Sequence, residues 1–351
     1  MRQYLLPEKG RFYKANLHCH STLSDGRLTP RQLADAYKAH GYSVLAITDH
    51  EFTADHSDLN SEGFLMLQGY ETYVKERPDD SRRMKTCHMN FIAKDPAQLK
   101  LIMVDPEYCT RYAAKNGVAV EDLPRVGDIC RRRYEPRCIN EMIRAARENG
   151  YLVAYNHPGW SLESIEELSR IHGFYAMEIY NHDCSHFSGF PGDDSRVYDQ
   201  LLRLGYECFC LATDDNHNKE PFDHPACDSF GGFTMIKAEE LTYGAIIAAL
   251  EKGHIYASQG PQFQALYVED GQLHVECSDV RAIHLITCCR TSAHGLYRQA
   301  YAPKGETINA ATIPLLKDDE YFRVEICDRE GYKAWSHAYQ LRDLDISEFG
   351  E

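Results

Sequence analysis

A chain of 351 residues, 43% hydrophobic and 26% charged, has the composition of a globular protein with room for one large domain and a smaller one. Its net charge of −15 argues against a nucleic-acid-binding face, which needs clustered Lys and Arg. No segment approaches the roughly 20 apolar residues of a membrane span, and the opening MRQYLLPEKGRFYK lacks the apolar stretch of a secretory signal. We therefore expect a cytoplasmic protein that binds neither nucleic acid nor a membrane.

The 13 cysteines are scattered and include no Cys-x-x-Cys pair. In a reducing compartment such cysteines are mostly small buried groups. We expect neither a disulfide framework nor a thiolate zinc site.

Short apolar runs alternate with helical patterns over the first 250 residues or so. The runs, which we predict to be strands, are 14–17, 43–47, 64–67, 89–93, 152–155, 176–179 and 208–212. Helices are predicted from Thr29-Pro30 to Gly41, over 137–149 and over 194–204, each followed by a glycine that ends it. Seven strands alternating with helices predict an α/β fold, a parallel barrel or a close variant.

Two other segments depart from this alternation. The stretch of about 94–136 is too long for a plain connection and predicts an inserted helix or lid. Its Arg131-Arg132-Arg133 cluster is interpreted as a solvated helix face. After a last helix at 242–252, alternating runs at 264–268, 273–277, 282–287 and 321–326 predict a small β-rich, sandwich-like module packed on the barrel. The expected domains are therefore 1–258 and 259–351.

Residues that bind metals fall at the ends of the predicted strands. In chain order they are His18 and His20 with Asp25 close behind, Asp49 and His50, Glu71, His88 at the entry of the fourth strand, Asn156 and His157, Glu178 with Asn181, and Asp214, Asp215 and His217. The C-terminal ends of parallel barrel strands converge on one face, so these side chains are expected to meet.

The spacing of these residues suits metal binding. Because side chains alternate along an extended segment, His18 and His20 point to the same side, and so do Asp215 and His217. Imidazoles and carboxylates without thiolates suit zinc, manganese or iron, and a central Glu can bridge two ions. Each motif alone is commonly incidental, but their joint placement at strand ends predicts a metal centre.

The segment NLHCHSTLSDGRLTPRQLADAYKAHGYSVLAITDH resembles the opening of the PHP (polymerase and histidinol phosphatase) superfamily, as do the later pieces GYET, CHMNF, YNHPG and ATDDNH. This resemblance covers roughly residues 13–258. The closing pieces GHIYASQGP and FRVEICDREGYKAWSHAYQL resemble the tail of the CehA/McbA branch, which includes a carbaryl hydrolase.

The resemblance implies a distorted (β/α)7 barrel holding two to three divalent metal ions (Mn, Fe or Zn). The first ion would be bound by His18, His20, Glu71 and Asp215; Glu71 would bridge to a second ion, completed by His88 and His157; and Asp25, His50 and His217 would hold a third. Asp214 is the rival of Asp215, which fits the family's Asp-x-His pattern. Asp49, Asn156 and Asn181 are expected to orient imidazoles through their free ring nitrogen.

The main functional hypothesis is a metal-dependent phosphoesterase (EC 3.1 type) that cleaves a small phosphorylated substrate with a hydroxide bridging two ions at Glu71. His182 and His186 are candidate proton donors to the leaving group. Arg82, Arg83 and Lys85 are candidate phosphate contacts, with a solvated loop as the competing interpretation. A carboxylic ester, carbamate or amide is the alternative substrate. A third hypothesis is a non-catalytic metal-binding protein whose tail, with Trp335, contacts a partner.

Overall fold

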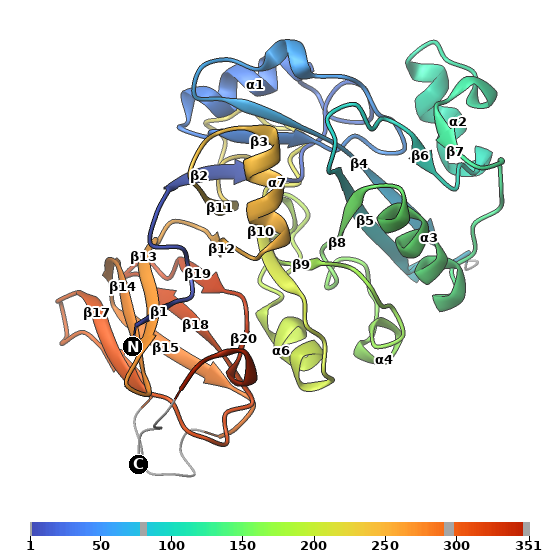
Figure 1. The fold of residues 1–351 in the computed structure, drawn as a ribbon. Coiled ribbons are helices and arrows are strands. Elements are labelled where there is room, and N and C mark those ends of the chain that lie inside the picture. Colours follow the sequence, from blue (N-terminus) through green and yellow to red (C-terminus); the bar gives the residue numbers. More distant parts are fainter. Residues whose placement is uncertain (1, 78–82, 291–297, 347–351) are drawn as a thin grey trace.

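A large mixed sheet runs through the protein and carries helices around it (Figure 1). The computed structural model describes residues 2–77, 83–290 and 298–346. The sheet has 14 strands, in the order β10-β9-β8-β5-β4-β3-β2-β11-β12-β19-β18-β15-β16, with β20 paired to β18. The fold is therefore of the mixed α/β class.

The seven strands predicted for the first part of the chain all form. They are β2 (Arg11–Asn16), β3 (Val44–Ile47), β4 (Leu65–Lys75), β5 (Thr86–Ala93), β8 (Tyr151–Tyr155), β9 (Ala176–Asn181) and β10 (Phe209–Thr213). Every residue of β3, β5, β8 and β9 is buried. Strands covered on both faces read as continuous apolar runs, which is why they could be found in the sequence.

The expectation of a parallel barrel is wrong for part of the sheet. Strand β5 pairs antiparallel with both β4 and β8, and β11 (Phe233–Ala238) pairs antiparallel with β2 and with β12 (Ile255–Ser258). The link from β4 to β5 covers only residues 76–85. A parallel pair needs a crossover of about a dozen residues or more, usually a helix, so this link returns the chain antiparallel.

A closed (β/α)7 barrel is not shown. Strand β10 lies at one end of the row of paired strands, and within the described ranges no ladder joins it to β2. The two segments meet instead just beyond their ends, in an isolated parallel bridge between Cys19 and Asn216. This bridge brings the segment that follows β2 beside the segment that follows β10.

The predicted helices also form. They are α1 (Pro30–Ala39), α3 (Pro136–Glu148), α6 (Ser195–Arg203) and α7 (Tyr243–Glu251), with the short α4 (Ile165–Leu168) and α5 (His182–His186) between them. Thr29 and Gln32 form a capping box at the start of α1, which satisfies backbone donors there. Gly41 follows its end at φ +76°, a left-handed conformation that favours glycine.

The segment 94–136 contains the helix α2 (Pro106–Lys115) and a small parallel sheet of β6 (Leu101–Ile102) and β7 (Arg125–Val126). It lies beside β4 and β5 in Figure 1. The interpretation of Arg131-Arg132-Arg133 as a solvated helix face is wrong, because these residues lie outside any helix and Arg132 is buried. Its guanidinium forms an ion pair with buried Glu51.

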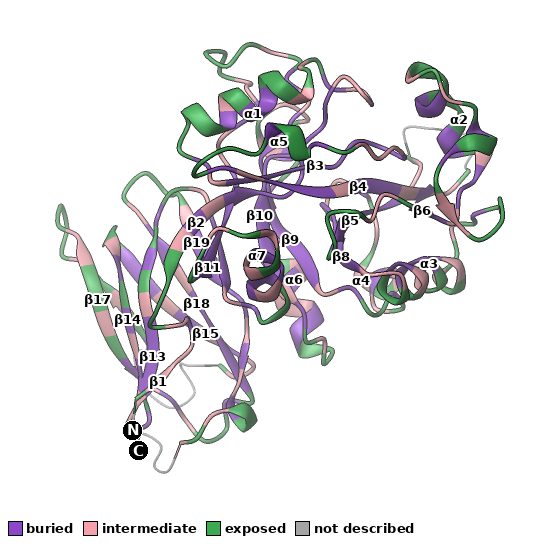
Figure 2. Cartoon of the chain, turned by 45° about the horizontal axis from the view of Figure 1, so that its top comes forward, coloured by how far each residue is buried: buried purple, intermediate pink, exposed green. Residues whose placement is uncertain are grey.

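The C-terminal segment is rich in strands, as expected. β13 (Phe263–Glu269), β14 (Gln272–Val280) and β17 (Ile308–Pro314) form a four-stranded sheet with β1 (Gln3–Tyr4). β15 (Ala282–Thr287), β16 (Gln299–Tyr301), β18 (Tyr321–Cys327), β19 (Lys333–Ser336) and β20 (Tyr339–Gln340) extend the large sheet. Apolar side chains of both sheets share one core, including Leu266, Val275, Ile283 and Val324, and stretches of both sheets are coloured as buried in Figure 2.

The large sheet crosses the expected boundary between residues 258 and 259, because β12 pairs with β19 through Ala257 and Trp335. The division into domains 1–258 and 259–351 therefore stays a prediction. All 13 cysteines are free, and most are buried. Within the described ranges, no helix combines the length and the apolar character that crossing a bilayer requires.

Candidate metal centre

The bridge beyond β2 and β10 brings two distant ligand pairs together. The amide of Asp215 donates to the carbonyl of His18 (2.9 Å), and the amide of His20 donates to the carbonyl of Asn216 (3.0 Å). Asp215, the second residue after β10, adopts a left-handed backbone (φ +54°). The His-x-His and Asp-x-His segments consequently lie side by side.

Four buried residues form the first cluster: His18, His20, Glu71 and Asp215, whose ligand atoms all lie within 4.8 Å of one another. Oδ1 of Asp215 is 3.0 Å from Nε2 of both His18 and His20. These two nitrogens are 3.2 Å apart. Each is also 3.4 Å from an oxygen of Glu71.

Glu71 lies at the middle of the wider arrangement and is almost completely buried. Its Oε1 is 2.9 Å from Nδ1 of His88 and 3.4 Å from Nε2 of His157. Its Oε2 is 2.8 Å from Nδ1 of His50. One carboxylate thus contacts imidazoles from several strand ends, a position suited to bridging two ions.

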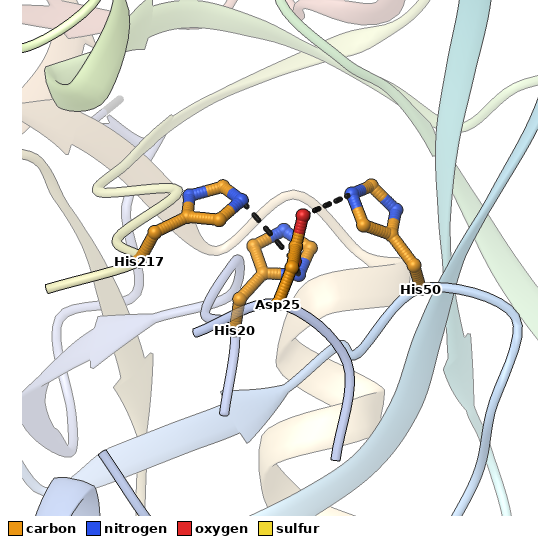
Figure 3. A group of neighbouring side chains, drawn as sticks. All are labelled: His20, Asp25, His50 and His217. Carbon is orange, nitrogen blue, oxygen red and sulfur yellow. Dashed lines mark ion pairs between the residues drawn. The ribbon is translucent and has the colours of Figure 1, made fainter. Parts of the chain in front are cut away.

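A further cluster comprises His20, Asp25, His50 and His217. Figure 3 shows the Asp25 carboxylate among the three imidazoles. Its oxygens lie 3.5 Å from Nε2 of His217, 3.8 Å from Nε2 of His50 and 3.8 Å from Nδ1 of His20. The structure therefore brings together all nine residues that the sequence proposed as ligands.

The donor atoms fit divalent cations. Nδ1 of His50 has no hydrogen-bond partner among the described residues, although it lies 2.8 Å from Glu71. The Nε2 atoms of His18 and His20 approach each other while both face Asp215. Lone-pair donors that converge on a common point in this way are arranged as metal ligands are.

The electrostatics of the centre lead to the same conclusion. Burial disfavours a charge on His20, but hydrogen bonds to Asp215 and Glu71 outweigh it and raise its pKa to about 10. Burial likewise opposes a charge on His18, yet the nearby carboxylates raise its pKa well above 6.5. Burial, followed by the charge on His20, lowers the pKa of His217 to about 3. His18 and His20 therefore hold protons in the metal-free protein, and metal binding would displace them.

Glu178 orients the first cluster, a role that the sequence did not reveal. Its Oε1 accepts from Nδ1 of His18 (2.6 Å) and from Oγ1 of Thr213 (2.7 Å). Its Oε2 accepts from the amide of His157 (3.0 Å) and from Nδ2 of Asn181 (3.0 Å). A carboxylate on the free nitrogen of a ligand histidine fixes the tautomer and the ring.

The expectation that Asp49, Asn156 and Asn181 orient imidazoles is wrong. The two asparagines donate to carboxylates of the centre, and Asp49 fixes a loop. Nδ2 of Asn156 donates to Glu71 (2.8 Å), and Nδ2 of Asn181 donates to Asp215 (3.1 Å) as well as to Glu178. Asp49 accepts from the amides and hydroxyls of Ser21 and Ser24, which start the loop that carries Asp25.

Asp214 and Asp215 have different environments. Asp214 is buried and accepts from Oη of Tyr37 and from the amides of residues 230–232. It holds the loop after β10, whereas Asp215 lies among the ligands. Another group, not anticipated from the sequence, joins Asp183 and Asp228 to His217.

The structure does not place the candidate acid and phosphate contacts in these clusters. Nδ1 of His182 is 2.9 Å from Oη of Tyr180, and its ring lies 3.9 Å from that of His186, tilted by 35°. Lys85 forms an ion pair with Glu167, and Arg83 is exposed. Arg82 lies outside the described residues.

A comparison with protein families matches residues 16–105 to the PHP domain. The 5′-3′ exoribonuclease of Haemophilus influenzae is 40% identical over 112 residues, which is 31% of this chain and 40% of that enzyme. The chain thus spans well under half of that relative.

Two solved structures are similar more remotely. One is a two-domain protein from Bacteroides vulgatus that contains a predicted PHP-like metal-dependent phosphoesterase (14% identity, 96% of this chain and 97% of that one, TM-score 0.45). The other is an amidohydrolase from Chromobacterium violaceum with bound sulfate and no metal (18% identity, 58% of this chain and 87% of that one, TM-score 0.38). At such low similarity, neither bears on the chemistry.

The matched segment contains His18, His20, Asp25, His50, Glu71 and His88. Together with the clusters it supports the PHP superfamily, a metal-dependent hydrolase and binding of divalent metals. The CehA/McbA branch stays a prediction.

Proposed function

We propose that the protein is a metal-dependent phosphoesterase that hydrolyses a small phosphorylated substrate at a centre of two to three divalent ions. The observation that carries this proposal is the position of Glu71, which belongs to the first cluster and also contacts His50, His88 and His157. The exoribonuclease relative adds support, since such an enzyme cleaves phosphodiester bonds.

In this proposal each side chain has a defined place. The first ion takes His18, His20, Glu71 and Asp215; the second takes Glu71, His88 and His157; the third takes Asp25, His50 and His217. Manganese, iron and zinc all suit imidazole and carboxylate donors. Such ions, when bound, polarise a phosphoryl oxygen and acidify water. The chain itself keeps His18 in one tautomer through Glu178 and holds Glu71 through Asn156.

His182 is a poor candidate for the proton donor to the leaving group. Burial, followed by the proximity of His186, lowers the pKa of His182 to about 3. Its imidazole is therefore neutral near pH 7, and its Nδ1 is already engaged with Tyr180. His186 remains the candidate from the sequence.

An aromatic wall favours the second candidate function, hydrolysis of a carboxylic ester, carbamate or amide. The partly exposed ring of Trp160 meets the rings of His88 and His157 edge-on, at 5.4 and 5.0 Å. Tyr73 stacks on His88 from another side, at 4.8 Å. An apolar wall suits an uncharged carbonyl substrate better than a phosphate.

The two candidates are separated by paired substrates that share a leaving group. The full chain, supplemented with Mn²⁺, is assayed with 4-nitrophenyl phosphate and with 4-nitrophenyl acetate, and its metal is counted by elemental analysis. We expect two to three ions and faster hydrolysis of the phosphate, both lost together in His18→Ala. Ester hydrolysis without phosphatase activity would move the assignment to the second candidate. Full activity in His18→Ala would contradict the centre itself.

A further inference from the structure

One face of helix α2, in the inserted segment, is directed at the cluster of His20, Asp25, His50 and His217. Cys109, Tyr112 and Lys115 follow one another at intervals of three residues, and the C-cap Asn116 comes four residues after Tyr112, so they lie on one side of the helix. Each contacts a part of the chain next to Asp25 or His50, as the following contacts show.

The first set of contacts fixes the loop that carries Asp25. Nζ of Lys115 donates to the carbonyl of Ser24 (2.5 Å), and Nδ2 of Asn116 donates to the carbonyl of Leu23 (2.8 Å). Asp49 holds the same loop from its inner side. Asp25 itself is 30% exposed at its side chain and, among the described residues, belongs to no other ligand cluster. Its position therefore depends on the loop that α2 holds.

The second set of contacts fixes His50. The ring of Tyr112 lies 5.7 Å from that of His50. The next residue, Glu51, is fully buried in a left-handed conformation (φ +52°) and pairs with Arg132 through both terminal nitrogens (2.5 and 3.0 Å). Sγ of Cys109 also contacts this carboxylate. Because the Glu51 amide donates to the carbonyl of Glu71 (2.8 Å), the pair fixes the backbone on which His50 is mounted.

We propose that the inserted segment sets the occupancy of the third ion, with Lys115, Asn116 and Arg132 as positioning residues. This inference rests on the proposed function and concerns its third metal position. Holding Asp25 and His50 in place before binding removes the cost of ordering them when the ion arrives. The bonds of Lys115 and Asn116 end on the carbonyls of Ser24 and Leu23 and do not touch Glu71. The first two ions, which use Glu71 and strand-end residues, should therefore bind without these two bonds.

The test is a Mn²⁺ binding isotherm of the metal-free full chain, measured by equilibrium dialysis and elemental analysis. Asn116→Asp replaces the amide donor by a carboxylate of the same shape and leaves the Leu23 carbonyl without the hydrogen bond from Asn116. Asn149→Asp is the matched control, because Asn149 ends α3 as Asn116 ends α2. Both side chains also donate to the carbonyl four residues earlier (2.8 Å). Lys115→Met is a second, independent variant that removes the bond to Ser24.

We expect three ions on the wild type and on Asn149→Asp. In Asn116→Asp and Lys115→Met, the weakest binding step should weaken by about tenfold or more while the two tighter steps stay unchanged. Isotherms equal to that of the control, equal weakening of all three steps, or a wild type that saturates at two ions would each overturn the inference. If Asn116→Asp does not fold, Lys115→Met decides alone. A wild type that binds three ions yet hydrolyses neither 4-nitrophenyl ester contradicts the proposed function, and the variant isotherms still decide this inference.

Discussion

Replacing Glu178 by Gln should weaken metal binding without enlarging or emptying the site. The carboxylate has two oxygens that both accept hydrogen bonds, one from His18 and Thr213 and the other from His157 and Asn181. A glutamine offers one oxygen and one NH₂ group. Whichever way the amide is turned, its NH₂ faces donors, so one pair of contacts is lost.

The size of the effect follows from these contacts. Loss of a carboxylate that orients a ligand histidine typically costs 10- to 100-fold in metal affinity, which corresponds to about 1.4–2.8 kcal/mol. The metal-free protein should also lose about 1–3 kcal/mol of unfolding free energy, because buried donors are left facing a donor. Both losses come from one site that lies outside the ligand set.

Glu178→Gln would be compared with Glu163→Gln in Mn²⁺ isotherms and in denaturant unfolding of the metal-free chains. Burial raises the pKa of Glu163 to about 8, so this carboxyl is largely protonated at pH 7 and Gln resembles it closely. Glu163 accepts a single bond from Oη of Tyr134. The reasoning is refuted if Glu178→Gln binds Mn²⁺ as tightly as Glu163→Gln does.

Further predictions concern pH, metal removal and the buried ion pair. Because the pKa values of His18 and His20 are raised in the metal-free protein, ions must displace protons there; Mn²⁺ affinity should therefore rise with pH, by up to about tenfold per unit for each proton released. Isotherms at about pH 6, 7.5 and 9 check this, and a flat profile would contradict it. After treatment with EDTA, the stabilising contribution of His20 should be complete below pH 6.5 and be lost as pH rises through about 10, so thermal unfolding should show the metal-free chain weakening over that window. Arg132→Met leaves buried Glu51 without its cation and should cost about 3–5 kcal/mol of unfolding free energy in urea. As a control, Arg133→Met at the exposed neighbouring position should change the unfolding free energy by no more than about 0.5 kcal/mol. Equal losses in the two variants would mean that the Arg132–Glu51 pair contributes nothing to stability.

What the sequence predicted well depends on local signals. Buried strands such as β3 and β8 are continuous apolar runs, and α1 begins at a capping box and ends at Gly41. The ligands were recognisable because each stands next to such a run. Hydrophobic periodicity and the signals that start and end helices therefore sufficed to find these elements and the ligand residues that follow them.

What it missed depends on contacts between distant residues. Arg132 stands in a basic triplet that looks solvated, and nothing local shows that Glu51, 81 positions away, buries its charge. Glu178 has the same difficulty, because its partners come from segments before and after β9 that only the fold brings together. A charged side chain can be buried when an oppositely charged partner pairs with it, and the topology of the fold determines which partner comes near.

The departure from a parallel barrel is also what completes the centre. In a parallel strand, a residue at the entry would lie at the end opposite to the other ligands. His88 stands near the start of β5, but β5 runs antiparallel to β4, so its start lies at the end of the sheet where Glu71 is. In that ladder Tyr73 pairs with His88, and Glu71 is two residues from Tyr73 and so on the same face. Glu71 and His88 are thus diagonal cross-strand neighbours, which accounts for their 2.9 Å contact. The reversal could not be predicted from the sequence, because the predicted strands 64–67 and 89–93 leave 21 residues (68–88) between them, enough for a crossover, whereas the longer β4 and β5 leave only residues 76–85.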